Sequence, residues 1–269
     1  LHSLRRRQRQ MCIRDRFVID FWKTGLHGEE IGIRQKEQYR SKSRHFTMDM
    51  DIIGKYIEDD KGVGFAAIRE KVWKGEKGEE LNGRLVLRLF TDEGRWLGSI
   101  EEVVIEELKN SIGSNDVIPV FAATIPNYDY VLWIEKVHRR HGFGEVYVFN
   151  YLSEKEDEPV SVFKIDENRL TIGSDWDVYY GPTKQKVAFI DSKRFNIGGK
   201  VEINIYDENF AKNNITSRAL VLFASTIKYH NDIKERIKKR IELIKKGEWF
   251  YKPDKGEAWL LRNPRKFLM

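Results

Sequence analysis

Unpaired basic side chains near the end of the sequence form the pattern that most directly suggests a chemical role. Between Lys228 and Lys246 there are eight basic and three acidic residues, a local net charge of 8 − 3 = +5. Each acid stands four residues before a base, the order that stabilises a helix; the pairs are Asp232–Arg236, Glu235–Lys239 and Glu242–Lys246. The cations left over are Lys228, Lys234, Lys238, Arg240 and Lys245. They predict weak binding to an anionic lipid surface, whereas a solvated helix explains the paired residues.

A glycine motif offers the alternative function. Residues Gly62–Ala67 (GVGFAA) fit the dinucleotide fingerprint G-x-G-x-x-A, and Asp92 follows downstream. That fingerprint needs a buried strand before the first glycine and a helix that begins at the phosphate. The acids at residues 58–60 would repel a diphosphate instead. A nucleotide-dependent enzyme is therefore the disfavoured alternative, and finding this segment between antiparallel strands would exclude it.

Other polar residues carry less information. His138 and His141 lie in one glycine-containing link, but no second pair of ligands completes a metal site. Asp49 and Asp51 share one strand face, where exposed carboxylates are common. Gly198 and Gly199 fit a hairpin turn as well as an anion-binding nest. No Ser, His and Asp motif suggests a nucleophile, so the sequence predicts no catalytic residue, no metal site and no cofactor.

The first sixteen residues distort the bulk charge. LHSLRRRQRQMCIRDR resembles a translated sequencing adapter, and we expect its deletion to leave the melting temperature unchanged. It holds six arginines and one aspartate, so removing it from 48 basic and 42 acidic residues leaves 42 against 41. A net charge of +1 argues against nucleic-acid binding. The only cysteine, Cys12, lies in this head, so the remainder has no disulfide or thiolate metal site.

One continuous helix is predicted from Ser217 to Lys246. Residues 219–224 (ALVLFA) are apolar on every side, which indicates a buried start, although a strand fits these six residues as well. Farther on, isoleucines recur in steps of four, four and three, at Ile233, Ile237, Ile241 and Ile244. Gly247 supplies the left-handed residue that ends a helix.

Short strands separated by turn residues precede this helix. They are predicted at Met48–Ile57, Phe65–Trp73, Leu85–Phe90, Trp96–Ile105, Tyr130–Val137, Glu145–Leu152, Val160–Ile165, Leu170–Ile172, Trp176–Tyr180, Lys186–Ile190 and Lys200–Tyr206. For Phe65–Trp73 a helix is the alternative. The pattern predicts one β-sandwich or barrel domain over residues 46–247, after a polar leader at 17–45. An aromatic tail at 248–269 is predicted to cover an open barrel end rather than enter a lipid interface.

Two strand-turn-strand units and the late helix resemble a known superfamily. LRLFTDEGRWLGSI, WDVYYGPTKQKVAFI and the run from GGKVEINIYDE into RALVLFASTIKYH are similar to tubby-like C-terminal domains, whose superfamily includes LURP-one-related proteins and scramblases. The resemblance covers residues 46 to about 246. It implies a closed twelve-stranded antiparallel β-barrel around a central helix, and some relatives bind phosphoinositides through basic residues. No binding residue carries over motif by motif.

Together these observations predict a mainly β, non-enzymatic binding or scaffold domain that recognises anionic phospholipid surfaces. Lys228, Lys234, Lys238, Arg240 and Lys245 are its predicted lipid-binding residues. No apolar run approaches the roughly 18 residues needed to span a bilayer. The sequence therefore predicts a cytoplasmic protein peripheral to the membrane, with no transmembrane segment and no nucleic-acid partner.

Overall fold

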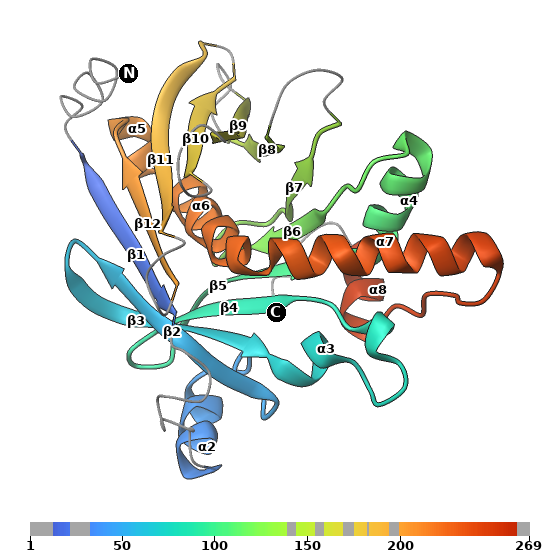
Figure 1. Ribbon diagram of the computed structural model, residues 1–269. Coiled ribbons are helices and arrows are strands. Elements are labelled where there is room, and N and C mark those ends of the chain that lie inside the picture. Colours follow the sequence, from blue (N-terminus) through green and yellow to red (C-terminus); the bar gives the residue numbers. More distant parts are fainter. Residues whose placement is uncertain are drawn as a thin grey trace.

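Twelve antiparallel strands close into one barrel in the computed structural model (Figure 1). The structure describes residues 13–21, 33–138, 144–153, 159–168, 175–181, 183–193 and 199–262. Its strands are β1 (Asp15–Phe21), β2 (Met50–Glu58), β3 (Lys61–Arg69), β4 (Val86–Thr91), β5 (Trp96–Glu102), β6 (Val120–Thr124), β7 (Leu132–Lys136), β8 (Val146–Leu152), β9 (Val160–Asn168), β10 (Asp175–Tyr180), β11 (Gln185–Lys193) and β12 (Lys200–Ile205). Each strand pairs with its sequence neighbours, and β1 pairs with β12 to close the barrel. The predicted fold class is confirmed.

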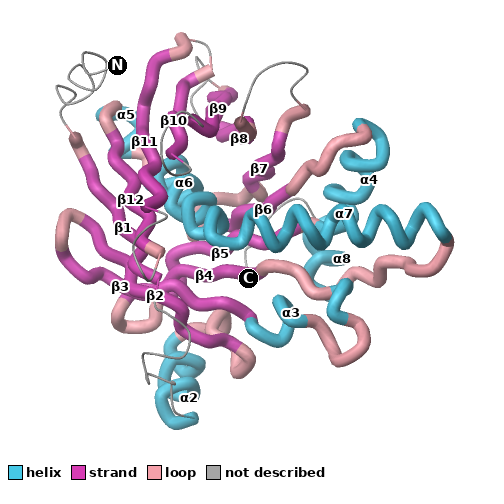
Figure 2. Tube along the Cα trace, in the orientation of Figure 1, coloured by secondary structure: helices cyan, strands magenta, loops and turns pink. Residues whose placement is uncertain are grey.

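Helices lie inside the barrel, at its rim and against its outer wall (Figure 2). They are α2 (Ile33–Lys42), α3 (Glu70–Lys74), α4 (Val104–Ser114), α5 (Glu208–Lys212), α6 (Asn214–Thr226), α7 (His230–Lys246) and α8 (Lys255–Arg262), with short 3-10 turns at Glu80–Asn82 and Ile227–Tyr229. The Asn213 side chain caps α6 by accepting hydrogen bonds from two backbone N–H groups. Gly247 ends α7 in the left-handed conformation, as predicted.

Helix α6 fills the barrel. Every residue from Ala219 to Ala224 is at most 1% exposed, and these side chains join one core with inward-facing residues of the strands. An all-round apolar surface suits a helix enclosed by a sheet on every side. The predicted buried helix is therefore confirmed, with a 3-10 turn at residues 227–229 where α6 passes into α7.

The predicted domain boundary at Phe46 is wrong, because residues 15–21 form a barrel strand. In β1, Ile19 and Phe21 are buried, and Arg16 donates to both carboxylate oxygens of Glu202, at 2.9 and 3.0 Å. Arg16 lies in the head, residues 1–16, whose deletion was expected to leave the melting temperature unchanged. Because Arg16 is part of the barrel, that expectation does not hold for this residue. Residues 1–12 lie outside the described residues. The apolar run at 17–21 was too short to be recognised as a strand by periodicity alone.

Helix α2 covers part of the outer wall. Its Tyr39 ring packs on Phe46 and Phe65, with ring centroids 5.2 and 5.0 Å apart. Those rings belong to a small apolar cluster with Met50 and Phe90. Within the predicted polar leader, α2 is thus a packed helix that shields apolar side chains on the outside of the barrel.

Several other boundaries differ from the predicted ones. The predicted strand Phe65–Trp73 begins earlier, at Lys61, and ends at Arg69, where α3 begins. The strand β6 and the helices α4, α5 and α8 were not predicted, and the predicted strand Leu170–Ile172 lies outside the described residues. The hairpins β4–β5 and β7–β8 pair as predicted.

Replacing Leu222 or Phe223 by alanine should lower the free energy of unfolding by about 2 to 5 kcal/mol, because each leaves a cavity in the barrel interior. Ile112, which is 48% exposed on α4, is the control, and Ile112→Ala should change stability by less than about 0.5 kcal/mol. Urea denaturation of the three variants measures this. Equal losses at all three positions would place α6 outside the core.

A buried histidine makes the barrel interior sensitive to acid. His230 lies among the rings of Phe121, Tyr147, Trp176 and Phe223, at centroid distances of 5.4 to 5.9 Å. Its Nε2 is 2.9 Å from the Thr226 hydroxyl, which itself donates to the Phe223 carbonyl. The Nε2–H of the ring therefore donates to Thr226. Burial, assisted by the positive charge of Lys234, lowers the pKa of His230 to about 3.

The unfolded chain takes up a proton on His230 below pH about 6.5, while the folded chain does not until about 3. Acid therefore favours unfolding in this window, by about 1.4 kcal/mol for each pH unit from this residue. His230→Gln should reduce the slope of unfolding free energy against pH between 6.5 and 4, whatever its effect on stability at pH 7. Parallel slopes for the two proteins would contradict the buried neutral ring.

Candidate functional site on helix α7

The five cations predicted to bind lipid do not form one surface. Arg240 is fully buried, at 0% exposure, so its prediction as a lipid-binding residue is wrong. Lys234 is half-buried and its ammonium is 3.1 Å from the Glu145 carboxylate. Lys238 bonds to Glu235 at 2.6 Å. Lys238 is nevertheless exposed, and so is Lys245 in the last turn of α7.

The fifth cation, Lys228, is exposed in the 3-10 turn before α7. Its ammonium lies over the ring of Phe21, 5.1 Å from the centroid, on the β1 side of the barrel. A cation over an aromatic face has a partner within the fold. Lys228 therefore lies before the start of α7 and Lys245 at its end, so the two do not belong to one surface.

Arg240 is held by carboxylates and backbone carbonyls. Its guanidinium donates to Glu102 at 2.9 Å and to the carbonyls of Leu81 and Gly83 at 2.9 and 2.5 Å. Glu107 lies 3.6 Å away, and both acids are fully buried. Because Arg240 is about half a helical turn from Lys238, it faces the barrel while Lys238 faces solvent. The predicted apolar stripe concealed this, since Arg240 falls between Ile237 and Ile241.

The charges of this cluster nearly cancel. Burial, with the charge of Glu102 in support, raises the pKa of Glu107 well above its usual range, and Arg240 only partly opposes this. One Glu107 oxygen accepts from Val120 N at 3.1 Å, and the other has no hydrogen-bond donor among the described residues. A proton on Glu107 leaves one cation beside one anion. Burial lowers the pKa of Arg240, but Glu102 and Glu107 outweigh burial and raise it, so it stays charged.

A second buried arginine ties the C-terminal tail to the same place. Arg84 donates to Asp254 at 2.6 Å and to Glu101 at 2.8 Å. The next acid, Glu257, is fully buried; it accepts from Ile105 N at 3.0 Å and from the hydroxyl of Tyr251. Leu260 and Leu261 of α8 pack against an apolar cluster that includes Val103 and Val120. The tail therefore lies against α4 and the barrel rim.

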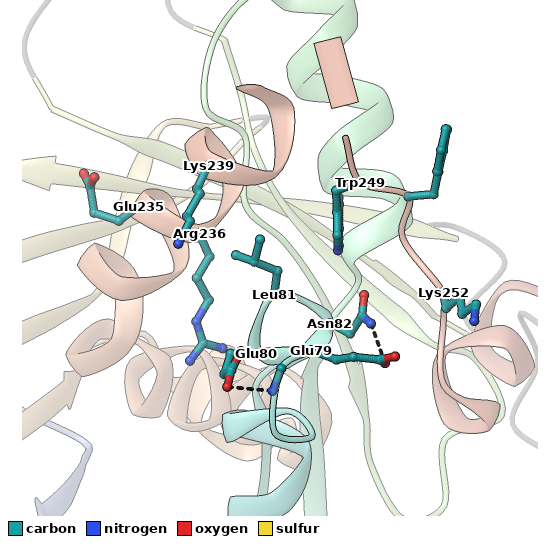
Figure 3. A pocket seen from close by; sticks show the side chains of 11 residues that line it. Glu79, Glu80, Leu81, Asn82, Glu235, Arg236, Lys239, Trp249 and Lys252 are labelled. Carbon is teal, nitrogen blue, oxygen red and sulfur yellow. Dashed lines mark hydrogen bonds between the residues drawn. The ribbon is translucent and has the colours of Figure 1, made fainter. Parts of the chain in front are cut away.

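A pocket of about 530 Å³ opens between α7, the loop before β4 and the tail (Figure 3). Its lining residues are Gly78, Glu79, Glu80, Leu81, Asn82, Glu235, Arg236, Lys239, Trp249, Phe250 and Lys252. Arg236 does not project into solvent as its predicted pairing with Asp232 implied. Its guanidinium stacks over Trp73 at 3.7 Å and donates to the Trp73 carbonyl at 2.9 Å. No sequence pattern predicts this pocket, because its three walls come from segments that lie far apart in the sequence.

The glycine motif is part of the barrel wall, which excludes its nucleotide interpretation. Residues 62–67 run through β3, antiparallel to β2 and β4, with no helix starting at Phe65. A Cβ at Gly64 would lie 1.9 Å from the Phe90 carbonyl oxygen. The glycine is required by this close approach of two strands, since no side chain fits there.

The remaining polar residues with predicted roles have structural partners. Asp49 pairs with Arg69 and Asp51 with Lys36, at 2.9 and 2.8 Å. His138 lies 3.2 Å from Asp116. His141 and Gly198 lie outside the described residues. Within the described residues, no group of three or more His, Cys, Asp or Glu side chains is arranged to hold a metal ion.

Comparisons with protein-family models, with curated proteins and with solved structures gave no match for this chain. The resemblance to tubby-like domains therefore stays a prediction. In the described part of the chain, the helices are all too short or too polar to cross a membrane.

Removing the Arg240 guanidinium should unfold the junction of α7 with the barrel rather than remove a surface charge. Arg240→Ala leaves the Glu102 carboxylate buried without its cation, and such a loss costs about 3 to 5 kcal/mol. Lys245→Ala, five residues later on the same helix, is the control and should cost less than about 0.5 kcal/mol. Chemical denaturation at pH 7 compares them, and equal stability of the two variants would contradict the buried cluster.

Proposed function

We propose that this chain is a non-enzymatic, tubby-like binding domain that docks on anionic phospholipid surfaces through the far end of α7. The observation that carries the proposal is Phe250, which is 77% exposed four residues beyond the exposed pair Lys245 and Lys246. Figure 1 shows the end of α7 projecting away from the barrel, so a flat surface can approach it. An exposed ring beside cations is the arrangement that interfacial segments use.

The strength of this attraction follows from the charges nearby. Each lysine near an anionic leaflet contributes about 1 kcal/mol, and Phe250 adds apolar area that enters the headgroup region. Glu242 and Glu248 are exposed in the same segment and oppose the lysines. Docking is therefore weak, reversible and sensitive to ionic strength. It places the protein at the cytoplasmic face of a membrane as a peripheral component.

Vesicle sedimentation of the full chain tests the proposal. The protein should pellet with vesicles that contain phosphatidylserine at low salt, stay in solution with neutral phosphatidylcholine vesicles, and be released as salt is raised. The double variant Lys245→Glu, Lys246→Glu should lose binding while keeping its melting temperature, because both side chains are exposed.

The matched control reverses two exposed lysines on the β2–β3 hairpin, Lys55→Glu and Lys61→Glu, with the same change of net charge. It should bind as the unaltered protein does. If both double variants lose binding equally, net charge rather than the α7 end is responsible. Equal sedimentation with neutral and anionic vesicles would reject the membrane proposal.

A further inference from the structure

Two buried acids and one buried base meet where α4 lies against α7. Glu102 at the end of β5, Glu107 on α4 and Arg240 on α7 are each fully buried. A buried charge that is not compensated costs a large free energy, so such a cluster has to be close to neutral. With all three side chains ionised, its formal charge would be 1 − 2 = −1. The cluster therefore needs one further positive charge.

Neighbouring groups do not supply this charge. Arg84, buried at the same rim, is engaged by two other carboxylates. Arg236, about one turn before Arg240, donates to two backbone carbonyls. The other titratable groups that face the cluster in the described part of the chain are Tyr147 of β8 and Tyr251 of the tail. Burial raises the pKa of both hydroxyls, so both are neutral, and a proton is the remaining way to balance the cluster.

The hydrogen bonds identify the atom that holds the proton. Glu102 uses one carboxylate oxygen for Arg240 and the other for Leu85 N, at 2.9 and 2.8 Å. Glu107 accepts from Val120 N through Oε1, but its buried Oε2 has no donor among the described residues. This Oε2 is 3.6 Å from the Arg240 guanidinium, too far for a hydrogen bond, while the Glu102 carboxyl lies within hydrogen-bonding reach. A proton on Oε2 turns this unpaired acceptor into a donor to Glu102.

We infer that the contact between α4 and α7 is a proton-dependent switch, in which Glu107 holds one proton at neutral pH and shares it with Glu102. With the proton in place, the cluster contains one cation and one anion. Loss of the proton in alkaline solution leaves two adjacent carboxylates beside one guanidinium in the interior, and their repulsion weakens the contact. The switch does not rest on membrane docking, because its three residues are buried and the proposed docking residues are exposed.

This switch acts in the opposite direction to His230. Burial, with the charge of Glu102 in support, raises the pKa of Glu107 well above 4.5, so the folded chain keeps a proton that the unfolded chain has lost. The stability that this carboxyl contributes is therefore complete below pH 4.5 and is lost as the pH rises toward the folded pKa. His230 has a lowered pKa and opposes folding in acid instead.

Urea denaturation of the full chain between pH 5 and pH 7 tests the inference by comparing the unaltered protein with Glu107→Gln. The amide keeps the shape of a protonated acid and can still donate to Glu102. The unfolding constant of the unaltered protein, divided by that of the variant, should rise about tenfold for each pH unit. His230 is present in both proteins, so its contribution cancels. Parallel stabilities of the two proteins across this range would overturn the inference.

The matched control is Glu235→Gln on α7. The Glu235 side chain is 71% exposed and pairs with Lys238 at the surface. This variant removes the same carboxylate charge from the protein without touching the buried cluster. Its stability should therefore follow that of the unaltered protein at each pH, and a tenfold change per pH unit for this variant as well would overturn the assignment to Glu107.

Carbon-13 NMR of the unaltered protein detects the proton directly and does not depend on the folding of a variant. The carboxyl carbon of Glu107 should have the chemical shift of a protonated acid at pH 7 and should change only in more alkaline solution. The Val120 amide, which donates to Glu107, should change over the same pH range. The exposed Glu235 marks the position of an ionised carboxylate in the same spectrum. A Glu107 carbon at that position at pH 7 would overturn the inference.

Discussion

A closed barrel has an interior that must be filled, and this constraint determines the rest of the structure. Strands β1 and β12 join the two ends of the sheet, so no edge is left and α6 is surrounded by sheet. The residues from Ala219 to Ala224 supply apolar surface in every direction, while Asn213 satisfies the start of the helix. The barrel and α6 depend on each other, because an empty barrel and an exposed helix would each leave a large apolar surface in water.

The second constraint arises where helix α7 leaves the barrel and buries a charged side chain. As α7 emerges from the interior, one face still lies against α4 and the loop before β4, and Arg240 on that face is paired with Glu102 at the end of β5. Arg84 extends the same compensation to Asp254, so the tail is fastened at this exit. The buried charges thus position two exposed features: the lysines with Phe250 at the helix end, and the pocket beside Trp249.

Local patterns were enough to predict the helix, its capping glycine and most hairpins, because each depends on residues close in sequence. The roles of Arg240, Arg84 and Arg16 depend on partners 138, 170 and 186 residues away, which no local pattern contains. Periodicity placed Arg240 among surface cations, since charged residues are rarely buried without a partner and the partner was not visible. The pocket was missed for the same reason. Residues 62–67 match the dinucleotide fingerprint in sequence, but they lie in β3 and no helix follows their glycines as that fingerprint requires.

Native-state hydrogen exchange tests most directly whether the buried helix and its charged exit form one unit. Amides of α6 and of α7 up to Arg240 should exchange only through global unfolding, with the same free energy as chemical denaturation, while the last turn of α7 exchanges at lower cost. Contradiction would come from an α7 that exchanges along its whole length at the rate of an exposed helix while α6 and the strands stay protected. In that case the Arg240 cluster would not hold the helix to the barrel.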